Sequence, residues 1–599
     1  MADHDLPNYA ARLTAFRTQL AADGLDGFVV PLTDEHMSEY VGDYAKRLEW
    51  LTGFRGSAGA AAVLPDRAAV FVDGRYTLQV QQQVDGSLFD YVGVPQSSIA
   101  AWLGEHAKAG ARIGYDPWLH NKGWVESVGK VVTLVPVARN PLDAVWADRP
   151  AMSPAKLKVQ SNELAGRSAA DKRAEIADWL TGHGLDATVM TALDSVAWTF
   201  NLRGDDVTHT PVGLAFAILH ADATADLFVE PHKIDETVRA ALGNGVRVHD
   251  RAAFAAMLAS LQGKRIASDP ERAVVAVFDA LAKGGATIVE ARDPAVLAKA
   301  IKNRVEQAGQ RSAQARDGAA LSRYLHWLSV EAPKGGLTEI SASDQLRKFR
   351  EATGKLLDLS FDTISGAGPH GAIMHYKASA ETDRRIDPSS VYLCDSGGQY
   401  ADGTTDVTRT IWVGPGDPPA EVKDRFTRVL QGHIAIARAV FPAGTTGGQL
   451  DGFARQFLWA AGCDYAHGTG HGVGAFLAVH EGPQRIAKPG GGQPGTAEPL
   501  VAGMFLSNEP GYYKPDHYGI RIENLVLVEE RQIAGGDMPM LGFETLTFAP
   551  IDKTMIEPAL LSDAERAWLD GYHADVLRIV GPQVEGEAKA WLESVCAPL

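Results

Sequence analysis

The feature that most constrains this chain of 599 residues is an internal duplication in its first half. Three short segments recur in the same order: 24–26 as 184–186, 50–56 as 198–204, and 112–117 as 265–270. Each copy follows the same pattern of a helix, a strand, a hairpin, a second helix and a second strand. Matched segments at a fixed order indicate two copies of one structural unit.

The duplication predicts two similar α/β domains, which we expect over residues 1–150 and 151–305. The segment 140–150 is predicted to be the connection between them, because it is rich in turn-forming residues. The first copy is longer between its first two matched segments, so we expect an inserted loop at about 34–46. The apolar run Ala69-Val70-Phe71-Val72 does not alternate with polar residues and is typical of a buried strand.

The pattern changes beyond residue 305. A long amphipathic helix is predicted over 306–328, and Pro333-Lys334-Gly335-Gly336 ends it. The rest of the chain is long enough for one large domain. We expect a catalytic domain over 306–599, because every chemical motif lies there.

The charge and the cysteines exclude several classes of function. A formal net charge of -17 argues against a nucleic-acid or anionic-membrane partner. The three cysteines form no Cys-x-x-Cys pair and are too few for a disulfide framework. The chain starts without a basic and apolar leader pattern, and no apolar run reaches roughly 18 residues. We therefore expect a cytoplasmic protein that binds neither membranes nor nucleic acids.

Two aspartates stand at the ends of neighbouring predicted strands. Asp395 follows the apolar run 391–394, Asp406 precedes Val407, and the glycine-rich residues between them predict a hairpin. A hairpin would bring the two carboxylates side by side. Buried carboxylates in that arrangement repel each other, and a divalent cation removes the penalty.

Three further residues extend this set. His471 lies in the glycine-rich run 467–474, Glu509 follows a short apolar strand, and Glu523 precedes the apolar run 525–528. Four acidic residues and one histidine form an oxygen-rich site that suits Mn²⁺, Mg²⁺ or Co²⁺. Carboxylates that bridge would permit two ions. A single aspartate before a turn is more often a turn-former, so the prediction depends on the whole set.

Other catalytic motifs are absent. The run 467–474 lacks the Lys-Ser/Thr of a phosphate-binding loop, and His480-Glu481 is not followed by the second histidine of a zincin helix. Arg55 stands where a nucleophile elbow needs glycine. Cys394 is interpreted as a buried strand residue rather than a nucleophile.

At these residues the sequence resembles the creatinase/aminopeptidase family of metallopeptidases, which has the pita-bread fold. The order Asp395, Asp406, His471, Glu509 and Glu523 is similar to the five-ligand dinuclear site of that family. The segments around His375, His467 and His480 resemble those that carry its active-site histidines. The segments 34–40, 53–59, 73–76 and 200–204 resemble the three-domain cytosolic aminopeptidase P subgroup, so the likeness covers nearly the whole chain.

The resemblance implies an α/β (α+β) protein with two creatinase-N-like domains and a C-terminal pita-bread catalytic domain. It implies a homodimer with two divalent ions per subunit, Mn²⁺ first and Co²⁺ or Zn²⁺ as alternatives. The implied reaction is release of the N-terminal residue from peptides with proline in the second position, by attack of a metal-bridging hydroxide. A prolidase that selects dipeptides, and an inactive scaffold on the same fold, are the alternatives.

The resemblance also implies roles for the individual side chains. Glu509 is a ligand that also accepts the proton of the attacking water. His375 and His480 hold the scissile carbonyl and stabilise the oxyanion, and His467 lines the proline side or relays a proton. Arg521 either orients an acidic ligand from behind or forms a surface salt bridge.

Overall fold

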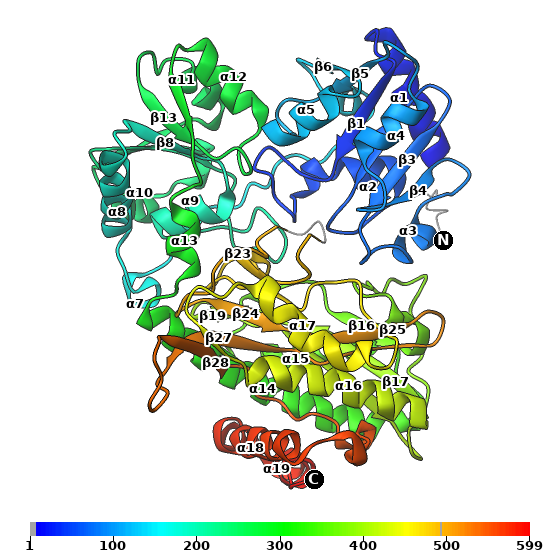
Figure 1. The fold of residues 1–599 in the computed structure, drawn as a ribbon. Coiled ribbons are helices and arrows are strands. Elements are labelled where there is room, and N and C mark those ends of the chain that lie inside the picture. The colour runs from blue at the N-terminus through cyan, green and yellow to red at the C-terminus, as the bar shows by residue number, and fades with distance from the viewer. Residues whose placement is uncertain (1–7, 491–493) are drawn as a thin grey trace. The chain divides into compact units, whose positions relative to one another are not determined.

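A computed structural model describes residues 8–490 and 494–599 of the chain (Figure 1). The protein comprises two compact units. One runs to Asn162 and resumes over Arg167–Val296, and the other consists of Glu163–Gly166 and Leu297–Leu599. Among the described residues, none of the helices combines the length and the apolarity that crossing a membrane requires.

The first unit contains two six-stranded sheets. The first sheet consists of β1 (Gly27–Pro31), β2 (Ala60–Val63), β3 (Ala68–Val72), β4 (Asp90–Gly93), β5 (Arg112–Tyr115) and β6 (Thr133–Pro136). The second consists of β8 (Ala187–Met190), β10 (Phe216–His220), β11 (Ala225–Phe228), β12 (Val246–His249), β13 (Arg265–Ser268) and β14 (Thr287–Glu290). The run that was predicted to form a buried strand, residues 69–72, lies in β3, which is buried throughout.

The two sheets have the same topology. Their strand orders are β4-β3-β2-β1-β5-β6 and β12-β11-β10-β8-β13-β14. In each copy the central strand pairs antiparallel with the next strand of the hairpin and parallel with the strand on its other side. The outer pairs also agree, strand for strand, in direction. The predicted similarity of the two halves is therefore confirmed.

Helices at corresponding places complete each copy. The first carries α1 (Tyr9–Ala22), α2 (Arg47–Thr52), α3 (Gln79–Gln83), α4 (Ile99–His106) and α5 (Lys122–Gly129). The second carries α8 (Ala169–Gly182), α9 (Leu193–Phe200), α10 (Glu236–Leu242), α11 (Phe254–Leu258) and α12 (Val275–Lys283). α1 and α8 each begin at a side-chain cap, from Asn8 and Ser168 respectively.

The expected insertion lies between β1 and α2, whereas β8 leads almost directly into α9. This loop is packed rather than free: Asp34 and His36 are buried, and the His36 ring stacks on Phe216 at 4.3 Å between centroids. The segment 140–150, which was predicted to be a connection, contains α6 (Pro141–Val145). Leu142 and Trp146 pack in the core of the first sheet, so this segment completes that core.

The second unit begins with α14 (Arg304–Glu331), the predicted long helix. Its start is a capping box, in which the Asn303 side chain accepts from the backbone of Glu306 and the Glu306 carboxylate accepts from the backbone of Asn303. A 3-10 turn over Ala332–Lys334 ends the helical region, and Gly335 follows with a left-handed φ of 73°.

Two sheets of this unit carry the chemical motifs (Figure 1). The smaller has the order β16-β17-β20, with β16 (Ile364–Ala367), β17 (Ser390–Ser396) and β20 (Val407–Val413). The larger has the order β21-β28-β27-β24-β22-β23. Its strands are β21 (Val440–Pro442), β22 (Gly470–Gly472), β23 (Glu481–Ile486), β24 (Phe505–Asn508), β27 (Asn524–Arg531) and β28 (Met540–Thr545).

Helices complete the second unit. They are α15 (Glu339–Glu351), α16 (Ala420–Ala437), α17 (Gly447–Trp459), α18 (Asp563–Ile579) and α19 (Gly586–Val595). One apolar core joins α16, α18 and α19 to the strand β26 (Tyr518–Arg521), with Phe426, Ile520 and Leu569 among its fully buried members. Burying such side chains is the main stabilising term of the unit, at about 1.5–3 kcal/mol for each large apolar residue.

Candidate metal centre

The hairpin of β17 and β20 brings the two predicted aspartates together. Asp395 lies near the end of β17 and pairs across the ladder with Thr408, and Asp406 directly precedes β20. Asp395 is 7% exposed and Asp406 is 4% exposed. The apolar residues of both strands face the core, which leaves these carboxylates buried at one end of the small sheet.

The larger sheet supplies the other three candidate ligands. His471 lies in the middle of β22, Glu509 directly follows β24, and Glu523 directly precedes β27. Backbone hydrogen bonds hold the two glutamates in place, because Glu509 N donates to Thr469 O at 2.8 Å and Glu523 N donates to Thr408 O at 3.2 Å. The second bond also joins the larger sheet to β20 of the smaller one.

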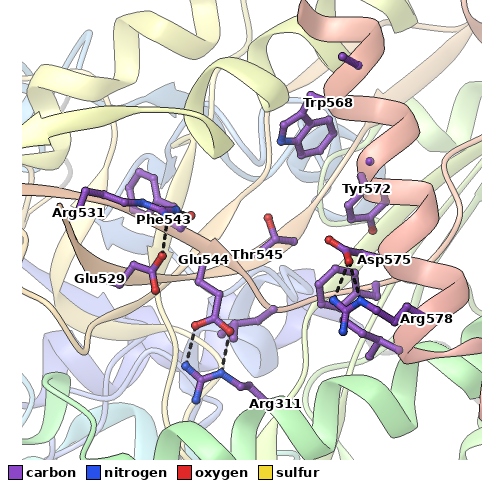
Figure 2. A pocket seen from close by; sticks show the side chains of 15 residues that line it. Arg311, Glu529, Arg531, Phe543, Glu544, Thr545, Trp568, Tyr572, Asp575 and Arg578 are labelled. Atoms are coloured by element: carbon purple, nitrogen blue, oxygen red, sulfur yellow. Dashed lines mark hydrogen bonds and ion pairs between the residues drawn. The ribbon is translucent and has the colours of Figure 1, made fainter. Parts of the chain in front are cut away.

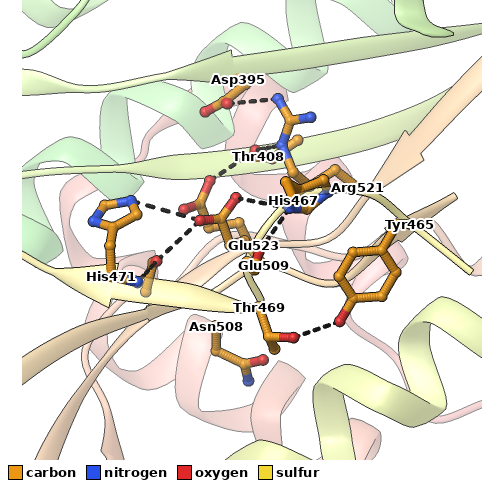
Figure 3. A network of polar contacts seen from close by, with 12 residues as sticks. Asp395, Thr408, Tyr465, His467, Thr469, His471, Asn508, Glu509, Arg521 and Glu523 are labelled. Atoms are coloured by element: carbon orange, nitrogen blue, oxygen red, sulfur yellow. Dashed lines mark hydrogen bonds and ion pairs between the residues drawn. The ribbon is translucent and has the colours of Figure 1, made fainter. Parts of the chain in front are cut away.

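Four of the five side chains converge closely, and Figure 3 shows three of them, His471, Glu509 and Glu523, together. Asp406, His471 and Glu523 each offer a ligand atom within 4.8 Å of the others. His471 Nε2 lies 3.5 Å from Asp406 Oδ2 and 3.6 Å from Glu509 Oε1. His471 Nδ1 donates to Gly472 O at 2.8 Å, so Nε2 is the nitrogen whose lone pair faces the carboxylates.

The charges of this cluster conflict unless a cation is present. Burial raises the pKa of Asp406, Glu509 and Glu523, and the neighbouring acidic groups raise each of them further. Asp395 Oδ1 is buried and accepts no hydrogen bond from the described part of the chain. A lone pair of histidine and several carboxylate oxygens that face one another form a donor set for hard divalent ions. The described residues therefore fit a metal centre.

Arg521 lies behind this centre rather than on the surface. It is 2% exposed, and its guanidinium donates to Asp395 Oδ2 at 2.6 Å and to Thr408 Oγ1 at 3.1 Å. Thr408 in turn donates to Glu523 Oε2 at 2.8 Å. Arg521 thus orients one carboxylate directly and a second through a hydroxyl, which is the geometry expected of a residue that supports metal ligands.

Two of the three predicted histidines lie beside the acidic cluster. The His480 ring is 4.4 Å from the His471 ring, edge to face. His467 Nδ1 is 3.8 Å from Glu509 Oε2, and its Nε2 accepts from the Tyr513 hydroxyl at 2.8 Å. A polar chain therefore runs from Arg521, which donates to the same hydroxyl at 2.7 Å, to His467.

His375 is half-buried and follows the turn η5 (Gly368–Ala372). The structure brings this turn against β26, the strand that ends in Arg521. A Cβ atom on Gly519 of β26 would lie only 1.7 Å from Gly371 O, so the close approach requires glycine at that position. The turn that precedes His375 is therefore fixed next to the strand that supports the metal ligands.

Some residues of the site were not singled out from the sequence. Thr408 is two residues from Asp406, and residues two apart along a strand face the same side, so strand alternation could have indicated it. Tyr513 and His433 had no such signal. His433, on α16, donates from Nδ1 to Asn508 O and accepts from Asn524 Nδ2, both at 3.1 Å, which ties the ends of β24 and β27 together.

A separate pocket of about 550 Å³ lies in the same unit, between α18, α14 and the ribbon of β27 and β28 (Figure 2). Trp568 and Tyr572 form part of its wall, and the three arginines that line it each pair with an acidic neighbour: Arg311 with Glu544, Arg531 with Glu529, and Arg578 with Asp575. The residues that line this pocket do not include any of the predicted site residues. This pocket is therefore distinct from the acidic cluster.

Known protein families match successive segments of the chain. Residues 12–144 and 148–306 each match the creatinase/prolidase N-terminal domain. Residues 308–530 match metallopeptidase family M24, and residues 539–599 match the C-terminal region of the M24 peptidases.

Full-length relatives are also similar. Aminopeptidase P2 of Arabidopsis thaliana is 40% identical over 621 residues, which cover 96% of this chain and 86% of that protein. A probable Xaa-Pro aminopeptidase P of Laccaria bicolor is 42% identical over 620 residues, which cover 99% and 94%.

A solved structure shows the same fold. It is the X-prolyl aminopeptidase of Caenorhabditis elegans, a cytosolic enzyme with a di-nuclear active site, with a TM-score of 0.93 and 33% identity. The match covers 99% of this chain and all of that one (100%). The expected fold, two creatinase-type domains followed by a pita-bread catalytic domain, is therefore confirmed.

Proposed function

Because the chain belongs to metallopeptidase family M24 and is a metal-dependent aminopeptidase, we propose that it releases the N-terminal residue from peptides whose second residue is proline. The observation that carries the proposal is the cluster of the buried Asp406, His471 and Glu523 with the partly buried Glu509, beside which Arg521 holds Asp395. It is supported by relatives of the same length that are named Xaa-Pro or X-prolyl aminopeptidases.

The proposed metal ligands are Asp395, Asp406, His471, Glu509 and Glu523, and the proposed cofactor is a pair of divalent ions. Mn²⁺ is the proposed native metal, because the donor set has carboxylate oxygens and one imidazole and no thiolate. When bound, such ions activate water for attack near neutral pH and polarise the carbonyl that is attacked.

The side chains of this chain supply the rest of the mechanism. Glu509 is the proposed general base; burial raises the pKa of its carboxyl, which favours taking up a proton from the attacking water. His467, 3.8 Å from the Glu509 carboxylate, is the proposed relay for that proton. His480 and His375 are proposed to donate to the carbonyl oxygen as negative charge develops there.

The proposed choice of substrate follows from the chemistry of proline. Its amide nitrogen carries a ring and no hydrogen, so a site that requires a donor at that position rejects it. We propose a site shaped for the ring, and longer peptides should add binding energy that is expressed in the transition state.

The finer organisation is also a proposal. A homodimer in the cytoplasm is supported by the likeness to the cytosolic worm enzyme for the compartment, and by the family resemblance for the dimer. Domain boundaries near residues 150 and 305 are supported by the two repeated sheets and by the family matches on either side of those positions.

A panel of short peptides tests the proposed function. Metal-loaded protein should release arginine from Arg-Pro-Pro faster than from the dipeptide Arg-Pro, and should hardly cut Arg-Ala-Pro. Chelation should abolish the activity, and Mn²⁺ should restore it best. Faster cleavage of the dipeptide would favour a prolidase, and metal-loaded protein that is inert on every peptide would favour an inactive scaffold.

A further inference from the structure

Glu481, the residue after His480, is held by two buried lysines. Its carboxylate forms ion pairs with Lys302 Nζ and, at 2.9 Å, with Lys299 Nζ. All three side chains are at most 1% exposed. Lys299 lies on α13 (Ala295–Ala300), and Lys302 lies between that helix and α14, so both are far from Glu481 in the sequence.

The short segment that carries the lysines also contacts a second strand of the larger sheet. Lys302 N donates to Gly503 O at 2.9 Å, and Ile301 forms a β-bridge with Met504. Lys302 Nζ is 5.4 Å from the centre of the Phe505 ring, on β24. One segment therefore contacts the first residue of β23 through side chains, and through its backbone it contacts Gly503 and Met504, which directly precede β24.

These two strands flank β22, since the order at this edge of the sheet is β24-β22-β23. Glu481 pairs across the ladder with Gly472, the neighbour of His471. β24 leads into Glu509. The three strands that the lysine segment spans are thus the ones that place His480, His471 and Glu509.

Burying this charge cluster is costly. Two ammonium groups and one carboxylate lose their water, and apolar residues of similar size would fill the same space at lower cost. Burial is the largest influence on the pKa of Lys302 and lowers it, while Glu481 opposes that shift. Apolar packing would not provide the directional hydrogen bond of Lys302 to one carboxylate oxygen or the charge of Lys299 beside the other, and that carboxylate belongs to the residue next to His480.

We propose that Lys299 and Lys302 are positioning residues that hold His480 in place through Glu481. The inference rests on the proposed function, in which His480 contacts the carbonyl of the substrate. The lysines touch neither substrate nor metal. Loosening them should displace His480 and slow the reaction, while the five proposed ligands stay in place.

A double-mutant cycle tests this idea. Lys302→Met keeps the aliphatic stem and removes the charge, and it should lower kcat about 10- to 100-fold, the effect of misplacing a reacting group by roughly 1 Å. KM should stay near its wild-type value, and so should the metal content, which elemental analysis measures. In a His480→Ala background the same change should lower kcat less than about threefold, because the side chain it positions is already gone. Lys299→Met is the second variant, should Lys302→Met fail to fold.

The matched control is Lys233→Met. Lys233 forms an equally buried ion pair with Asp206 in the other unit, 2.6 Å long and 1% exposed on both sides. It should cost stability but leave kcat unchanged.

The outcomes separate the two hypotheses. Three results would overturn the positioning role alone. They are a wild-type kcat in Lys302→Met, a loss of kcat from Lys302→Met that is as large in the His480→Ala background as in wild type, and a loss of kcat that accompanies loss of metal. A wild-type kcat in His480→Ala overturns the role of His480 in the proposed function, and the positioning role with it.

Discussion

Replacing Asp406 with asparagine should change stability in opposite directions with and without metal. Asp406 is 4% exposed, and its ligand oxygen lies within 4.8 Å of that of Glu523. Asparagine has nearly the same shape but no charge. The substitution therefore removes one repulsive partner from the acidic cluster and one proposed ligand from the metal ions.

The repulsion sets the size of the effect. At the 4.8 Å limit of that separation, two like unit charges cost about 3.5 kcal/mol at an effective dielectric constant of about 20. Burial and neighbouring acids raise the pKa of both carboxyls in the metal-free fold, so proton uptake caps the cost. A carboxyl with a raised folded pKa destabilises the fold above its unfolded pKa of about 3.9. At pH 7 the metal-free variant should therefore be more stable than metal-free wild type by about 1–3 kcal/mol.

Bound metal should reverse this order of stability between Asp406→Asn and wild type. A ligand at 100 times its Kd stabilises the folded state by about 2.7 kcal/mol, and the variant should lose most of that gain. Differential scanning calorimetry of chelated protein, with and without Mn²⁺, measures both effects, and elemental analysis counts the bound metal. The control is Asp317→Asn, which breaks a buried pair with Arg350 and should destabilise both forms alike.

Two results would refute this reasoning. One is a metal-free Asp406→Asn protein that unfolds at a lower temperature than metal-free wild type. The other is a rise in Tm on adding Mn²⁺ that is as large in the variant as in wild type. Either would mean that Asp406 does not belong to an acidic cluster that binds metal.

Two further predictions concern the residues around the centre. Arg521→Met should weaken Mn²⁺ binding by roughly 10- to 100-fold, because the carboxylates it orients lose their support, and a metal titration that gives an unchanged Kd would contradict this. Burial, and then the charge of Arg409, lower the pKa of His433 to about 3, below its unfolded value of about 6.5. The contribution of His433 to stability is therefore complete above pH 6.5 and falls as the pH drops, by about 2 kcal/mol at pH 5. Urea unfolding of His433→Gln should lack this part of the pH dependence, and an unchanged slope would show that the histidine is not held neutral.

Much of the fold could be predicted from the sequence because its signals are local. The two copies in the first half have matched segments, and their sheets share one strand order. The helix predicted over 306–328 begins within a few residues of its predicted start, at the capping box that Asn303 forms with Glu306. The segment 140–150 was the exception: its turn-forming residues resemble a connection, but Leu142 and Trp146 pack into a core that only the folded chain reveals.

Local sequence likewise predicted only part of the candidate site. Asp395 and Asp406 flank one hairpin, so their approach follows from a short stretch of sequence. The other three candidate ligands come from separate motifs, and it was the resemblance to a family that supported all five as one dinuclear site. Thr408 could have been found from strand alternation, whereas Tyr513 meets His467 across 46 residues and His433 meets Asn508 across 75.

The helices, the strands and the chemical character of the site follow from local sequence, because propensity, capping and alternation act over a few residues. Which charges meet depends on how those elements pack. Arg521 reaches Asp395 across 126 residues, and Lys302 reaches Glu481 across 179. Whether a buried charge meets a partner, a repulsive neighbour or a metal depends on how sheets and helices pack. That packing is the summed result of many weak apolar contacts, and no short stretch of the sequence encodes it.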